Sequence, residues 1–143
     1  MLRSLTALTT VAALAAVGFV AAPASAQDTT PRIFVSNCEK QVYKPKTITV
    51  FCADAGVVIN KITYSNYGTK TARGTGTAAV NLCEPNCAAG KTQNFQVRFR
   101  LSKPTQCGDA SQFRRLRVTY VGAKPPGDRV IRQSFQCADA PTR

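Results

Sequence analysis

Hydrophobic and polar positions alternate along three segments in the second half of the chain. In residues 94–102 (NFQVRFRLS), the hydrophobic side chains fall on one face and the polar side chains on the other. This period of two is typical of a strand with one buried face. The same alternation recurs in residues 113–121 (FRRLRVTYV) and 130–137 (VIRQSFQC). The pattern therefore predicts three half-buried strands in this part of the chain.

Shorter hydrophobic runs come before these segments and predict further strands. They occupy residues 33–35, 46–53, 57–67 and 75–82. Clusters of Gly, Pro, Asn and Asp separate the runs, and no convincing helical period follows residue 26. Short strands at regular spacing indicate an antiparallel sandwich or barrel. We expect an all-β fold, namely a single antiparallel, immunoglobulin-like β-sandwich stapled by disulfides.

The segment 57–67 (VVINKITYSNY) departs from strict alternation. Its hydrophobic period slips between Ile59 and Ile62, where one extra residue interrupts the alternation. Such a slip predicts a bulge or a break near residues 60–61.

Two tyrosines of the same segment, Tyr64 and Tyr67, stand three residues apart. On a regular strand this spacing makes them point to opposite faces, so we expect one in the core and the other exposed. Tyr67, beside Gly68, is a candidate binding residue. Packing as a loop anchor is the commoner role for a tyrosine in such a place.

The first 26 residues have the pattern of a secretory signal peptide. Arg3 supplies a positive charge, residues 5–22 an apolar stretch, and residues 24–26 (ASA) the small residues of a cleavage site. Cleavage after Ala26 leaves residues 27–143 as a single disulfide-stabilised β domain. No second hydrophobic segment follows, so we expect no membrane span after cleavage. The protein is expected to be secreted, and to be extracellular or associated with the cell wall.

All six cysteines lie after residue 26, and the sequence contains no histidine. An even number of cysteines in a small exported chain predicts a disulfide framework. The six are Cys38, Cys52, Cys83, Cys87, Cys107 and Cys137. Without histidine, a zinc site would need cysteine and carboxylate ligands alone, and we predict no metal and no cofactor. Cys83 and Cys87 frame a Pro-Asn turn, and they could bond to each other or to other loops.

Basic residues outnumber acidic residues after residue 26. That part of the chain holds 18 Lys and Arg against 7 Asp and Glu, which is a net charge of +11. A small protein with this charge is attracted to anionic surfaces, such as envelope polymers, phospholipid headgroups and nucleic acid. The charge could equally serve solubility alone.

The polar faces of the three alternating segments carry arginine. If these strands are neighbours, as consecutive strands tend to be, the arginines form a basic stripe on the outer face of the sheet. The five candidate binding residues are Arg98, Arg100, Arg115, Arg117 and Arg132. Guanidinium groups suit phosphate and carboxylate partners, whereas the alternative is an ordinary solvated polar face. The aromatic residues fall mostly on the inner faces, which argues against nucleic-acid binding as the purpose of the stripe.

Catalytic options are few. The absence of histidine removes serine–histidine and cysteine–histidine catalysis and leaves paired carboxylates. Only Asp54 and Glu84 lie beside cysteines that could bring their loops together. Because turn and surface roles are commoner for such residues, we predict no catalytic residues and a protein that is not an enzyme.

Four motifs of the chain together form a longer pattern. They are FCADAG (51–56), ITYSNYG (62–68), ARGTGT (72–77) and NLCEPNCAAG (81–90). In this order they resemble a family of small secreted actinobacterial proteins of unknown function, over roughly residues 50–121. The resemblance implies an exported all-β domain and no particular activity. It also implies a bridge from Cys52 to the loop of Cys83 and Cys87, with Cys107–Cys137 as a reasonable second bridge.

These features lead us to expect an exported, non-catalytic protein of the cell envelope or extracellular space. Its partner is expected to be an anionic envelope polymer or a protein, and the chain is expected to be a monomer. Two alternatives stay open. One is a carboxylate-dependent hydrolase of wall glycans that uses Asp54 and Glu84. The other is a secreted effector or inhibitor that contacts a protein through the proline-rich loop 122–128.

Overall fold

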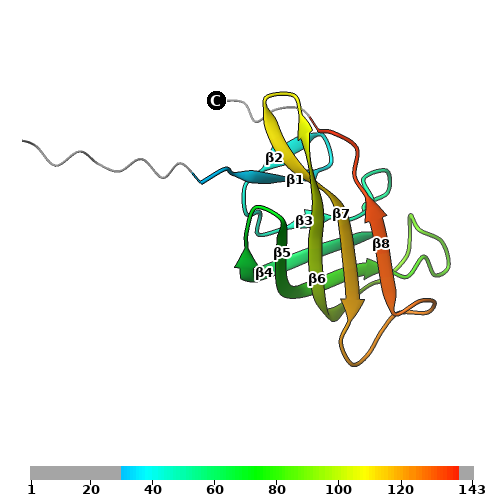
Figure 1. The fold of residues 1–143 in the computed structure, drawn as a ribbon. Helices are drawn as coiled ribbons and strands as arrows, with labels where there is room; N and C mark the ends of the chain where they lie inside the picture. Colours follow the sequence, from blue (N-terminus) through cyan, green and yellow to red (C-terminus); the bar gives the residue numbers. More distant parts are fainter. Residues whose placement is uncertain (1–29, 139–143) are drawn as a thin grey trace, which may run out of the picture.

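The computed structural model describes residues 30–138, which form one curled β-sheet (Figure 1). The strands are β1 (Ile33–Asn37), β2 (Lys40–Val42), β3 (Ile48–Thr49), β4 (Val57–Tyr67), β5 (Thr71–Asn81), β6 (Thr92–Cys107), β7 (Ala110–Tyr120) and β8 (Val130–Ser134). The signal peptide predicted at residues 1–26 lies outside the described residues. Between residues 30 and 138, no helix is long and apolar enough to cross a membrane.

The strand order in the sheet is β2-β1-β7-β6-β5-β4-β3. β8 joins the same edge of β7 as β1, because β1 pairs with residues 111–113 and β8 with residues 115–119. All pairs are antiparallel except β1 with β7, which is parallel. The all-β fold with disulfides is therefore confirmed, whereas the immunoglobulin-like, purely antiparallel sandwich of two sheets is wrong. The protein is a single mixed sheet, curled strongly into a half-barrel.

The sheet stays in one piece because its four longest strands pair consecutively. β4, β5, β6 and β7 each bond to the next along most of their length. A sandwich would need the chain to leave one sheet and continue in another. Here the sheet instead folds over its own inner face, and in Figure 1 parts of β4 and β5 run crosswise to β6, β7 and β8.

Two glycines of β5 allow this curvature. A side-chain carbon added at Gly74 would lie 2.8 Å from Cζ of Phe99, and one added at Gly76 would lie 2.8 Å from Cγ2 of Ile59. Both distances are too short for real contacts, so only glycine lets these side chains pack directly on the β5 backbone. On β4, Tyr64 lies opposite Gly74 of β5. The Tyr64 ring packs edge to face against the Phe99 ring, with the two centroids 5.5 Å apart.

The hydrophobic core lies on the inner face of the sheet. The inward residues of β6 and β7 are buried as their alternation predicts, and Leu101, Leu116 and Val118 are each at most 1% exposed. β1 contributes Val35 and the segment after β8 contributes Phe135, so both ends of the described chain reach the same core. Full burial of such a side chain stabilises the fold by about 1.5–3 kcal/mol.

The predicted irregularity in β4 is present, together with a second one. The β4–β5 register shifts between Asn60 and Thr63, which confirms the predicted bulge, and shifts again between Tyr64 and Asn66. The second shift inserts an extra residue between the two tyrosines. Tyr64 and Tyr67 therefore contact each other, with ring centroids 5.0 Å apart, and both pack against the core. The expectation that they point to opposite faces is wrong because the bulge changes the alternation.

The two tyrosines also link β4 to the start of the described chain. The Tyr67 hydroxyl donates a hydrogen bond to the carbonyl oxygen of Ile33 in β1, at 2.6 Å. The Tyr64 hydroxyl donates to the carbonyl oxygen of Pro45, between β2 and β3, at 3.0 Å. β1 and β4 are far apart in the strand order. These bonds therefore hold the curled sheet closed where no strand pairing does so.

The six cysteines form three disulfides, Cys38–Cys52, Cys83–Cys87 and Cys107–Cys137. The expected Cys107–Cys137 bridge is confirmed. The bridge from Cys52 to the loop of Cys83 and Cys87 is wrong, because Cys52 bonds to Cys38. The curl brings β1 near β3, where the Thr49 amide donates to Oδ1 of Asn37 at 2.9 Å, and the two cysteines follow these residues closely in the chain. Three disulfides indicate an oxidising environment.

The segment after β8 is held by side-chain amides instead of a strand ladder. Gln112 donates to the carbonyl oxygen of Gln136 at 2.7 Å and accepts from the Ala138 amide at 3.1 Å. Gln41 donates to the carbonyl oxygen of Ala138 at 2.9 Å. Both glutamines are buried, and the amide of Gln112 is bonded at both ends, whereas Oε1 of Gln41 has no hydrogen-bond partner within residues 30–138. Together with Cys107–Cys137 they fix the end of the described chain.

We predict that Tyr67→Phe destabilises the protein, because it removes the hydroxyl that bonds to Ile33. The loss in the free energy of unfolding should be about 1 kcal/mol, measured by urea denaturation of the oxidised protein. Tyr43→Phe is the matched control, since Tyr43 is 40% exposed and its hydroxyl makes no hydrogen bond within residues 30–138. Equal stabilities of the two variants would show that the Tyr67 hydroxyl does not hold the sheet closed.

Candidate functional site

Four arginines lie directly opposite one another across β5, β6, β7 and β8. Arg100 of β6 pairs with Arg73 of β5 on one side and with Arg117 of β7 on the other. Arg117 in turn pairs with Arg132 of β8. Opposed residues in a sheet share a face, so all four side chains lie on the outer, convex face. We call Arg73, Arg100, Arg117 and Arg132 the arginine row.

The row contains three of the five arginines predicted as candidate binding residues. The other two lie in adjacent rows of the same face: Arg98 is opposite Thr75 and Thr119, and Arg115 is opposite Ser102 and Ser134. The predicted pairing of the three arginine-bearing strands is thus confirmed. Whether the five arginines bind anything stays a prediction.

Arg73 belongs to the row, but sequence reasoning missed it. It lies on β5, where the inward positions are Ala72, Gly74, Gly76, Ala78 and Val80, so that only the last is a large hydrophobic residue. Small residues and glycines do not register as a hydrophobic period, so the alternation of β5 is hidden. A regular alternation of small with larger polar residues (ARGTGTA) is the signal that could have located Arg73.

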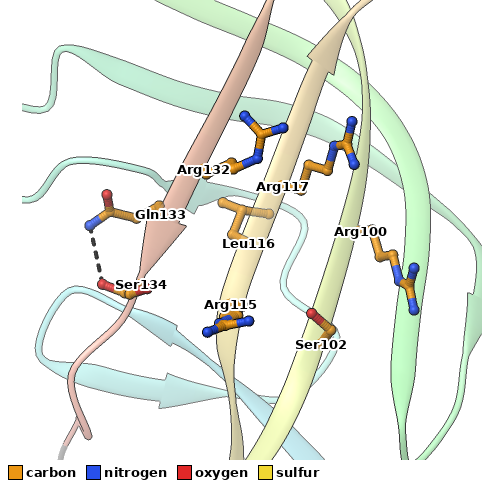
Figure 2. Close-up of a pocket in the computed structure, with 8 residues that line it drawn as sticks. All are labelled: Arg100, Ser102, Arg115, Leu116, Arg117, Arg132, Gln133 and Ser134. Carbon is orange, nitrogen blue, oxygen red and sulfur yellow. Dashed lines mark hydrogen bonds between the residues drawn. The ribbon is translucent and has the colours of Figure 1, made fainter.

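An open depression of about 550 Å³ lies over the middle of this face (Figure 2). Arg100, Arg117 and Arg132 line it on one side, and Figure 2 shows these three side chains following one another across β6, β7 and β8. Ser102, Arg115 and Ser134, from the adjacent row, line the other side. The depression therefore lies between two rows of the sheet and carries four guanidinium groups.

No acidic side chain of the described residues balances the row. Within residues 30–138, no hydrogen bond or ion pair joins any of its four side chains to another group. The acidic residues of that part of the chain all lie outside the strands, and they are Glu39, Asp54, Glu84, Asp109 and Asp128. Three consecutive pairs of like charge face each other directly, and like charges directly opposite in a sheet are destabilising. Within the described residues, the row is therefore a face of one charge sign, and a solvated polar face and a binding surface both stay open as its role.

Tyr67, the sixth candidate binding residue, is partly buried, whereas a binding residue is expected to be exposed. Its hydroxyl is engaged with Ile33, and the Lys44 ammonium lies 5.3 Å from the centre of its ring. Burial raises the pKa of Tyr67 to about 12, an effect to which Tyr43 adds and which the Lys44 backbone amide opposes. Burial also raises the pKa of Tyr64, with a smaller contribution from Tyr67. We therefore leave Tyr67 out of the candidate binding surface.

The two candidate carboxylates occupy exposed loops. Oδ1 of Asp54 accepts a hydrogen bond from the Gly56 amide at 2.9 Å, which is the local bond of an Asx turn. Glu84 is exposed in the loop that the Cys83–Cys87 disulfide closes. Neither residue lines the depression over the arginines. In the described part of the chain, no group of three or more His, Cys, Asp or Glu side chains could hold a metal ion.

Comparison of the chain with protein-family models, with curated proteins and with solved structures gave no match.

We predict that Arg117→Gln stabilises the protein, because Arg117 faces an arginine on both sides. The free energy of unfolding should rise by about 0.2–1 kcal/mol at low ionic strength, the size of an interaction between exposed charges. The gain should shrink as salt screens the charges. Arg98→Gln is the control, since Arg98 loses the same charge but faces only threonines. If Arg117→Gln were less stable than Arg98→Gln at low salt, the row would not be a source of repulsion.

We also predict that stability falls in the alkaline range as Tyr64 and Tyr67 ionise. The pKa of Tyr67 in the folded protein lies above its ordinary value of 10.0. A group with a raised pKa stabilises fully below its unfolded value, and this contribution is lost as the pH rises through the folded value, here from about 10 to about 12. Urea denaturation across this range should show a smaller decline for the Tyr64→Phe/Tyr67→Phe double variant. Identical slopes in both proteins would contradict the assignment.

Proposed function

We propose that this protein is an exported, non-catalytic binder of an anionic polymer of the cell envelope. The arginine row is the observation that carries the proposal. Repulsion between three pairs of like charge, with no acidic side chain beside them, lowers the free energy of unfolding of the protein. A bound polyanion would offset this repulsion. Arginine suits this purpose because its planar guanidinium group bonds to phosphate and carboxylate with two parallel hydrogen bonds.

The shape of the surface supports a polymer more than a small ligand. The depression is open, lies on a convex face and is lined by long flexible side chains. Small-molecule sites are usually concave and largely apolar. A polymer can instead contact many exposed charges at once, and such binding depends strongly on salt.

The two alternatives have less support. A wall-glycan hydrolase would need Asp54 and Glu84 to act together, and the Asp54 carboxylate is held in its own turn. A protein-binding role for the proline-rich loop 122–128 has no comparable observation in its favour. Lys124 of the loop donates to the carbonyl oxygen of Gly127 at 2.7 Å, and Arg129, which follows the loop, donates to that of Gly122 at 3.0 Å. These side chains stabilise the loop itself.

We predict that the Arg100→Gln/Arg117→Gln/Arg132→Gln triple variant loses binding to an immobilised polyanion such as polygalacturonate. Affinity at moderate salt should fall by about tenfold or more, and the dependence of log affinity on log salt should become shallower by about one unit per arginine.

The control is Lys40→Gln/Lys46→Gln/Lys61→Gln, which removes the same charge from exposed positions outside β5 to β8. This control should lose much less affinity than the arginine variant. Equal losses would show that net charge alone drives binding, and absence of salt-sensitive retention of the unaltered protein would end the proposal.

A further inference from the structure

We infer that the bound polymer lies across the strands, along the arginine row, and that it is an unbranched polysaccharide with an acidic group on each sugar. This inference rests on the proposed function, and it adds the direction of the polymer, its chemical class and a role for Arg73.

The direction follows from counting charges along each axis of the sheet. Along β6 the outer face offers Arg98 and Arg100, and along β7 it offers Arg115 and Arg117, so a polymer parallel to a strand meets two arginines. Across the strands, the row offers four arginines in unbroken register. A polymer that follows the row therefore meets twice as many arginines, and one cation more than along β6, where the exposed Lys103 follows Ser102.

The spacing of the row indicates how closely the anions of the polymer repeat. Neighbouring strands lie about 4.8 Å apart, whereas alternate residues along one strand lie about 6.7 Å apart. With each ring an extended pyranose chain advances by a distance comparable to the strand spacing, and consecutive rings are rotated about the chain axis. An acidic group on every sugar, and not only on every second one, therefore keeps an anion near each strand of the row.

The residues beside the row also suit a polysaccharide. Hydroxyl side chains flank the arginines on both sides, and they are Thr71, Thr75, Ser102, Thr119 and Ser134. Within residues 30–138 none of these hydroxyls makes a hydrogen bond, so each can bond to a sugar hydroxyl. No aromatic residue lies on the outer face of β5 to β8, so nothing there could stack on nucleobases.

Arg73 is the residue that distinguishes the two directions. Arg73 and Arg98 are both exposed, and both are neighbours of Arg100. Arg73 is its neighbour across the strands, and Arg98 is its neighbour along β6. Arg73 also extends the row beyond the depression, which the arginines of β6, β7 and β8 line.

The test compares Arg73→Gln with Arg98→Gln, using polygalacturonate and its defined oligomers in titration calorimetry. Arg73→Gln should weaken binding by about three- to fivefold, as expected for one exposed ion pair. Arg98→Gln should weaken it no more than the remote Lys61→Gln. Arg73→Lys should recover most of the affinity, because it keeps the charge. Circular dichroism of each variant verifies that the sheet is intact.

Oligomer length gives a second measurement. Affinity of the unaltered protein should rise with each added sugar up to about four, the number of strands that carry the row. In Arg73→Gln the rise should stop one sugar earlier.

Each contrary result overturns a defined part of the argument. If Arg98→Gln weakens binding more than Arg73→Gln, the polymer runs along β6, and the inference fails while the proposed function stands. If polyphosphate of equal charge binds as tightly as polygalacturonate, the polysaccharide class is wrong. If the unaltered protein retains no polyanion at all, the proposed function itself fails.

Discussion

The continuous register of β5, β6 and β7 is the constraint on which the rest of the structure depends. It places Phe99 between Gly74 and Val118 on the inner face, where the core needs a large ring over a bare backbone. The same register places Arg100 between Arg73 and Arg117 on the outer face. A slip of one residue would exchange the two faces. The packing of the core therefore prevents the arginines from moving apart. Burial of the inward side chains keeps the strands in a register that holds the outward guanidinium groups opposite each other.

The curl of the sheet also determines which distant segments meet. Because the sheet folds over itself, β1 comes close to β4 and β3, and hydroxyl bonds and a disulfide replace strand pairing there. The three disulfides close segments of 14, 4 and 30 residues. In the chain-entropy account, the longest segment gives the largest stabilisation. That segment ends just after β8, which carries Arg132, so the bridge also holds the last arginine of the row in place.

A face that costs stability is informative about function. Surface charges on most proteins are interspersed with charges of opposite sign, which limits repulsion. Here the acidic residues of the described chain lie in turns and loops, and the strands carry only basic charge. Within residues 30–138 no acidic side chain is bonded to the arginine row, which leaves its guanidinium groups available for the external anion of the proposed function.

Much of the fold and part of the site could be predicted from the sequence. The period of two in β6, β7 and β8 is a local property, and it correctly predicted three strands, the outward arginines and the buried faces of β6 and β7. The strand predicted over 130–137 ends at Ser134, and no residue of β8 is fully buried. The bulge near residues 60–61 was also visible as a slip in that period. These features depend only on neighbouring residues in the chain, because side-chain direction alternates along any strand.

Other features depend on contacts between distant residues, and only the tertiary structure decided them. A period of two is the same in a sandwich and in a curled sheet, so it could not reveal that β1 would pair with β7. The second bulge, after Tyr64, placed Tyr67 beside Tyr64, and the curl brought Cys52 to Cys38. The arginine row itself required the register of four strands. Local sequence determined which side chains face outward, and long-range pairing decided which of them stand opposite each other.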